Sequence, residues 1–106
     1  SANAAFTVFQ NVEKKVRNKN INQFFAPEVL NSNMGLGVDW EKADIYSLAK
    51  TILYIITGSV IEDAGNIETM DELEIDDVLR IVLIEMLNEV PENRPSLREL
   101  LNALGK

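Results

Sequence analysis

The sequence predicts a small, mainly helical domain with an irregular N-terminal quarter. Apolar residues recur at helical spacing between Ile45 and Ile56, and again over residues 75–88. The phrase Ser96-Leu97-Arg98-Glu99 is a capping box ahead of a third apolar run. A chain of 106 residues is long enough for one small domain but not for two.

The N-terminal quarter shows little helical periodicity. Residues 5–12 alternate weakly and allow a short strand or extended segment, whereas residues 13–25 are polar, basic and rich in Asn and predict a loop. Pro27 suits the first position of a helix, so residues 28–31 are expected to form one helical turn. Residues 31–37 contain Asn, Ser and two glycines and predict another loop.

The strongest predicted element is a helix from about Trp40 to Thr57. Asp39 is the expected N-cap and Gly58 the expected C-terminal stop. Its apolar residues, recurring at helical spacing, are Ile45, Leu48, Ala49, Ile52, Leu53 and Ile56, and Tyr54 and Ile55 widen this face. A helix that is apolar over most of its circumference is expected to be central and packed on several sides.

The C-terminal half predicts three further helices. Their expected bounds are residues 69–73, residues 75–88 with Pro91 as the stop, and a last helix that follows Ser96 and ends at Leu104 before Gly105. Four large side chains are expected to pack in or beside the core, namely Trp40, Tyr46, Met70 and Met86.

Composition narrows the chemistry. The chain has no cysteine and no histidine, which excludes a disulfide framework, a thiolate metal site and the usual general base. A net charge of -7 argues against a nucleic-acid partner. Residues 14–19 are basic and residues 62–77 are strongly acidic; such runs are solvated faces in most proteins, and the functional alternative for the basic run is contact with an acidic peptide or a phosphate. Because no signal peptide and no membrane-spanning segment is visible, we expect a cytoplasmic protein without a membrane partner.

Four phrases share an order and spacing that points to one family. They are Phe25-Ala26-Pro27-Glu28, then after 15 residues Asp44-Ile45-Tyr46-Ser47-Leu48-Ala49, then Thr57-Gly58, and finally Asn93-Arg94-Pro95. Together they resemble the C-terminal part of the large lobe of a serine/threonine protein kinase-like catalytic domain, from the Ala-Pro-Glu motif to the last helix. The resemblance implies an activation-segment-like stretch over residues 1–19 and a helical subdomain over residues 20–106.

The resemblance also implies roles for individual residues. Glu28 and Arg94 are expected to form a buried ion pair, and a guanidinium can grip a carboxylate through two parallel hydrogen bonds. The alternative is two solvated surface charges. In the family the residue matching Asp44 holds the catalytic loop, although a carboxylate at a helix N-terminus is favoured by the helix dipole alone. The segment from Ile21 to Phe25 is expected to border the substrate peptide. Phe24 matches the aromatic residue that commonly precedes the Ala-Pro-Glu motif by two positions in the family.

Several motifs that phosphoryl transfer needs are missing. The chain has no Gly-rich loop, no phosphate-binding lysine in its motif, no His-Arg-Asp loop and no Asp-Phe-Gly metal ligand. We therefore expect no catalysis, no metal site and no cofactor in this chain as it stands; ATP and magnesium are implied only for a complete parent kinase. Ile21 occupies the position where such kinases usually carry a threonine, and no Ser, Thr or Tyr lies between Thr7 and Ser32.

Three interpretations follow. The chain is the substrate platform of a kinase-like domain, or part of a pseudokinase or scaffold that binds proteins without transferring phosphate, or an unrelated helical interaction domain. The expected partner is a protein or peptide, and the acidic run favours a basic one. The apolar excess of the central helix further predicts a homodimer, or exchange of N-terminal segments between copies.

Overall fold

The computed structural model describes residues 21–31 and 37–105. Its elements, in chain order, are η1 (Ile21–Phe24), α2 (Pro27–Asn31), α3 (Trp40–Thr57), α4 (Ile67–Asp71), α5 (Asp77–Met86), η2 (Pro91–Asn93) and α6 (Leu97–Leu104). Every regular element in these two ranges is helical, so the prediction of a mainly helical fold is confirmed. The predicted stretch over residues 1–19, the extended segment at 5–12 and most of the loop at 31–37 lie outside the described residues.

Helix α3 begins and ends where the sequence predicts. The carboxylate of Asp39 accepts a hydrogen bond from the backbone N–H of Lys42 at 3.3 Å, which caps the first turn. Gly58 adopts a left-handed conformation with φ of 74°, and its N–H donates to the carbonyl of Tyr54 at 2.8 Å. A residue without a Cβ enters this region at little cost, so the helix stops there.

The prediction for the last helix is also confirmed. The Ser96 hydroxyl accepts from the Glu99 backbone N–H at 3.1 Å, and the Glu99 carboxylate accepts from the Ser96 N–H at 3.3 Å. This reciprocal pair satisfies two backbone donors that the first turn of α6 would otherwise leave free.

The predictions for three segments were partly wrong. Residues 21–24 form the 3-10 helix η1 instead of a loop, because the buried Phe24 gives this segment a contact with the core. Helix α4 starts earlier than expected, since Asn66 caps it. Helix α5 starts only after its own cap, Asp76, and it ends at Met86, so Pro91 opens the turn η2 and is not the residue that stops the helix.

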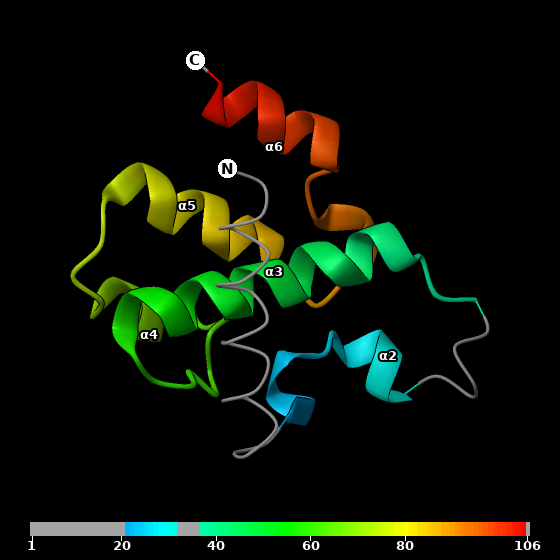
Figure 1. The fold of residues 1–106 in the computed structure, drawn as a ribbon, viewed down its shortest axis with the longest axis horizontal. Helices are drawn as coiled ribbons and strands as arrows, with labels where there is room; N and C mark the ends of the chain where they lie inside the picture. The colour runs from blue at the N-terminus through cyan, green and yellow to red at the C-terminus, as the bar shows by residue number, and fades with distance from the viewer. Residues whose placement is uncertain (1–20, 32–36, 106) are drawn as a thin grey trace, which may run out of the picture.

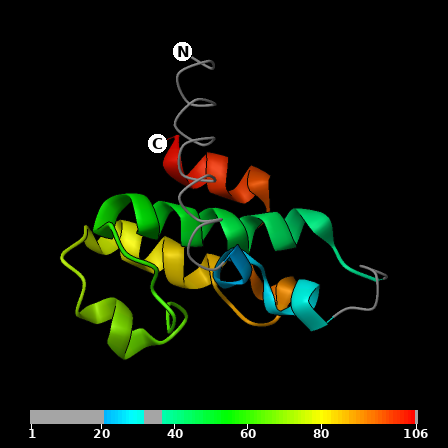
Figure 2. The same ribbon diagram turned by 60° about the horizontal axis from the view of Figure 1, so that its bottom comes forward.

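The long helix α3 crosses the centre of the molecule (Figures 1 and 2). It contacts η1, α5 and η2, while α4 packs against α5. In both views α2 and α6 lie on opposite sides of α3. Segments from the two ends of the described chain are therefore held together through one helix.

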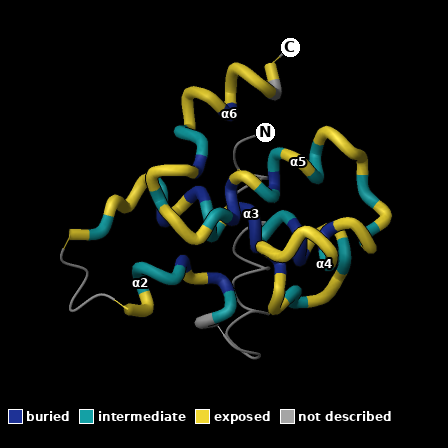
Figure 3. The backbone as a smooth tube through the Cα atoms, turned by 180° about the vertical axis from the view of Figure 1, so that it is seen from behind, coloured by how far each residue is buried: buried dark blue, intermediate teal, exposed yellow. Residues whose placement is uncertain are grey.

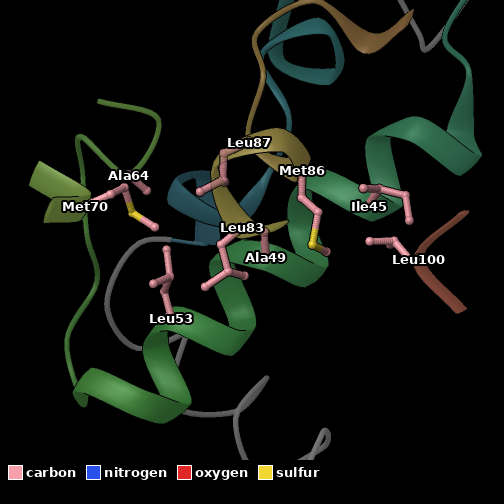
Figure 4. Packing of buried hydrophobic residues seen from close by; sticks show 9 residues of the cluster. All are labelled: Ile45, Ala49, Leu53, Ala64, Met70, Leu83, Met86, Leu87 and Leu100. Atoms are coloured by element: carbon pink, nitrogen blue, oxygen red, sulfur yellow. The ribbon is translucent and has the colours of Figure 1, made fainter. Parts of the chain in front are cut away.

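The main core forms between α3, α4 and α5 and also reaches α6. It consists of Ile45, Ala49, Leu53, Ala64, Met70, Leu83, Met86, Leu87 and Leu100 (Figure 4). The α3 members are spaced four residues apart and so share one face of the helix. Met70 and Met86 are buried as predicted. A second, smaller cluster joins Phe24 to Tyr54.

The expectation that α3 would be covered on several sides was only partly right. Leu48, Ile55 and Ile56 are exposed, and Trp40, which was expected to pack beside the helix, is 54% exposed. The burial colours in Figure 3 show buried residues alternating with half-buried and exposed ones along α3, and exposed residues over most of α6. In the described residues, no helix is long and apolar enough to cross a membrane.

Candidate functional site

The most densely connected polar site is centred on Arg94, between η2 and α6. The backbone of Arg94 is extended, and its N–H donates to the carbonyl of Pro91 at 3.1 Å, which closes η2. Pro95 and the capping Ser96 then start the next helix. These two turn-forming neighbours fix the backbone on either side of Arg94, whose side chain is fully buried.

Arg94 forms a two-pronged ion pair with Glu28. Its Nη1 donates to Glu28 Oε2 at 2.5 Å and its Nη2 donates to Glu28 Oε1 at 2.8 Å. The Arg94 side chain is 0% exposed and that of Glu28 is 19% exposed. The hydrogen bonds from Arg94 lower the pKa of Glu28 below its ordinary value of 4.5, against the opposing effect of burial. The structure therefore brings these two predicted partners together as a partly buried pair.

The remaining donors of Arg94 meet backbone carbonyls. Nε donates to Asn88 O at 2.7 Å, Nη1 also donates to Lys42 O at 3.0 Å, and Nη2 also reaches Glu89 O at 3.5 Å. These three bonds and the two to Glu28 match the five N–H donors of a guanidinium. A second hydrogen bond joins the same two residues, because Lys42 Nζ donates to Arg94 O at 2.6 Å.

An aromatic ring covers one face of the guanidinium. The Arg94 Cζ lies 5.0 Å from the centre of the Tyr46 ring, within the range of a cation–π interaction. Burial raises the pKa of the Tyr46 phenol. We call Glu28, Lys42, Tyr46, Asn88 and Arg94 the Arg94 cluster; it ties α2, α3 and the segment before α6 into one unit.

The Glu28–Arg94 pair holds parts of the fold together and has no free group for acid–base chemistry. Both Glu28 oxygens are occupied by the guanidinium, and an arginine does not release its proton at accessible pH. The Glu28–Arg94 pair therefore offers neither a free base nor a nucleophile. Elsewhere in residues 21–31 and 37–105, no group of three or more Asp, Glu, His or Cys side chains is placed to hold a metal ion.

The predicted peptide-bordering residues separate in the structure. Phe24 is buried, and its ring packs edge-on against Tyr54 with the ring centres 5.9 Å apart. Phe24 is thus a core residue and has no free face for a peptide. Phe25 is exposed beside it. Ile21 begins η1, and its side chain lies outside the described residues.

Asp44 lies on the exposed side of the first turns of α3. It makes no hydrogen bond or ion pair with any residue that the structure describes. Its placement agrees with the simpler expectation for this residue, a carboxylate near a helix N-terminus.

Sequence reasoning missed Lys50, which is buried in α3. Its side chain is 4% exposed, and Nζ donates to the carbonyl of Ile61. Burial lowers the pKa of Lys50, and the neighbouring charges of Glu62 and Asp63 oppose that shift. A sequence signal was present, since Lys50 is four residues from both Tyr46 and Tyr54 and so shares their helix face.

Arg80 is a second missed cation. Its Nε donates to Met70 O at 3.0 Å, and its Nη2 donates to Leu73 O at 2.7 Å and Ile75 O at 3.1 Å. Its Nη1 is paired with Asp77. These bonds hold the connection between α4 and α5 against the start of α5, and they turn the positive charge towards the interior.

Comparison with protein-family models, with curated proteins and with solved structures found no match for this chain.

Proposed function

We propose that this chain is the substrate-platform half of a serine/threonine protein kinase-like domain, whose parent transfers the phosphoryl group of ATP to protein hydroxyls. The observation that carries the proposal is the Glu28–Arg94 pair. It joins the Glu of the Ala-Pro-Glu phrase to the Arg that precedes the last helix, 66 residues away. A chance similarity of short phrases would not be expected to place these two side chains in bidentate contact beside the central helix.

In this proposal the chain binds the protein substrate and leaves the chemistry to other parts of the parent. Phe25 is exposed just before α2, the helix that carries Glu28, and is the best-placed contact for a peptide. Ile21 remains a second candidate. Asp44 would act as the anchor of a catalytic loop only when that loop is supplied. We place this activity in the cytoplasm, which imaging of the fluorescently tagged natural protein would test.

A pseudokinase or scaffold is the second candidate. It is favoured by Ile21 at the position of a usual threonine, and by the absence of hydroxyl side chains between Thr7 and Ser32. A stretch without Ser, Thr or Tyr cannot be switched by phosphorylation. Such a protein would use the same surface to bind partners without transferring phosphate.

A phosphotransfer assay separates the two candidates. The longest natural chain that contains this sequence would be incubated with labelled ATP, magnesium and two general substrates, myelin basic protein and casein. A kinase gives labelled serine or threonine, the R94M variant loses that label, and the exposed-site control E92Q keeps it. Absence of label from a folded protein would reject the kinase and leave the scaffold.

We further propose that the isolated chain associates with itself, as a homodimer or by exchange of N-terminal segments. The support is the exposed apolar side of α3, which carries Leu48, Ile55 and Ile56. Light scattering over a range of concentrations tests this. A mass that stays at one chain at high concentration would contradict it.

A further inference from the structure

Most of the charged side chains exposed on the described part of the protein are acidic, because most of its basic side chains bind backbone carbonyls. Four of its basic residues, Lys42, Lys50, Arg80 and Arg94, donate hydrogen bonds to backbone carbonyls, which leaves Arg98 as the remaining basic side chain in the described ranges. By contrast, every Asp and Glu in those ranges except Glu28 is exposed. Among the described residues, only Glu28 and Asp77 are paired with a basic side chain, so most of the exposed carboxylates keep their charge.

One helix combines this charge with exposed apolar side chains. On α5, Val78 is 68% exposed and Ile81 is 59% exposed. Asp77, Val78, Ile81 and Glu85 are spaced by one, three and four residues, which places them on one side of the helix. We call these four residues the α5 face. The opposite side of α5 carries the buried Leu83 and Met86, so the α5 face points away from the core.

We infer that the α5 face docks a basic amphipathic segment of a partner protein. The support is charge complementarity: the exposed apolar pair would gain from burial against a partner, and the carboxylates beside it favour a basic partner. Asp77 is already bound to Arg80, whereas Glu85 makes no ion pair with a described residue. Lysine and arginine suit this border, since their alkyl stems extend the apolar contact while their heads reach the carboxylates.

The matching partner is therefore a short segment with apolar residues on one side and Lys or Arg around them. Val78 and Ile81, one turn apart, would supply the apolar contact. This inference goes beyond the proposed function and does not depend on it, because the α5 face is separate from the Arg94 cluster and from Phe25.

The test is fluorescence anisotropy with a labelled helical peptide of Leu and Lys that has one apolar side. A peptide of the same composition with its order scrambled is the control for charge alone. The amphipathic peptide is expected to bind at least about tenfold more tightly, because burial of Val78 and Ile81 contributes more than the free energy equal to one factor of ten.

Paired variants locate the site. V78S/I81S is expected to weaken binding about tenfold or more, while L97S/L101S, which removes two comparably exposed apolar residues from α6, is expected to leave it within about twofold. E85K is expected to weaken binding and flatten its salt dependence, and E92K, an exposed charge in η2, to do neither. Circular dichroism checks that each variant keeps its helices; all these side chains are exposed.

Three results would overturn the inference. Equal binding of the ordered and scrambled peptides would show attraction by net charge alone. Equal losses in V78S/I81S and L97S/L101S would show that no site on α5 exists. Self-association that V78S/I81S abolishes would show that a second copy of this chain, with its own basic residues 14–19, occupies the face instead.

Discussion

Two buried cations lie in or against α3: Lys50 belongs to the helix and Arg94 packs against it, and their charges are held in different ways. Arg94 is fully buried with five hydrogen bonds, two of them to the carboxylate of Glu28. Lys50 is almost as buried, but among the described residues its ammonium group has a single hydrogen-bond partner, the carbonyl of Ile61. An arginine keeps its charge, so its burial requires a counter-charge, whereas a lysine can release its proton when burial disfavours the charged form.

The difference teaches which buried charge the fold depends on. Arg94 links residues from both ends of the described chain, while Lys50 holds only the loop that follows its own helix, eleven residues away. Losing the first should open the contact between distant segments, and losing the second should affect one loop.

The largest expected effect is the loss of the carboxylate or the guanidinium. E28Q and R94M should each lower the free energy of unfolding by roughly 3–5 kcal/mol, because the remaining partner is left in the interior without its counter-charge. E28Q should be the more damaging, since Arg94 is fully buried and Glu28 retains some contact with water. Thermal unfolding followed by circular dichroism measures this, and the exposed control E92Q should stay within about 0.5 kcal/mol.

An unchanged melting temperature in R94M would contradict the assignment of the Arg94 cluster as the contact that holds the fold together. A double variant sharpens the point. E28Q/R94M should cost less than the sum of the two single changes, because removing both members leaves no unpaired charge.

Lowering the pH should weaken the Glu28–Arg94 pair and with it the stability of the fold. The pKa of Glu28 is below 4.5 in the folded protein, so the pair's stabilisation is complete above about pH 4.5 and is lost as the pH falls through the folded value. Urea unfolding at successive pH values should show a steeper acid decline for the natural protein than for E28Q. Parallel declines would mean that Glu28 titrates as it does in the unfolded chain.

The ring of Tyr46 should contribute a smaller amount to the same cluster. Y46L removes the aromatic face over Arg94 and should cost about 1 kcal/mol, the size of a partly desolvated cation–π contact. Y46F keeps the ring and is the matched control, expected to be close to the natural protein. If Y46F and Y46L lose the same amount, the hydroxyl and not the ring face carries the effect.

The smallest expected change in the free energy of unfolding comes from replacing Lys50. K50M keeps the length of the side chain and removes a charge whose burial is unfavourable, so its stability should lie between unchanged and about 1 kcal/mol higher. The pKa of Lys50 is lowered below its ordinary 10.5, so in the natural protein stability should rise with pH from the folded value towards 10.5. K50M should lack that rise. A loss above about 2 kcal/mol in K50M would show that the bond to Ile61 is as important as the bonds of Arg94.

Local rules predicted much of the fold. The caps at Asp39 and Ser96 and the stop at Gly58 were correct because each depends on groups within a few residues. The bounds of α4 and α5 were less accurate, since Asn66 and Asp76 compete with several other polar residues that could equally start a helix. The candidate site was foreseen only through a resemblance, which pointed to Glu28 and Arg94.

The sequence by itself determined the bounds of α3 and α6, since capping and periodicity act over one or two turns. Only the tertiary structure decided which side of each helix meets the core. Spacing made Leu48 and Ala49 equal members of one apolar face, yet packing against α5 buries Ala49 and exposes Leu48. It also decided that Lys50 and Arg80 turn inward, because their partners are carbonyl groups, which every residue carries and no sequence pattern singles out.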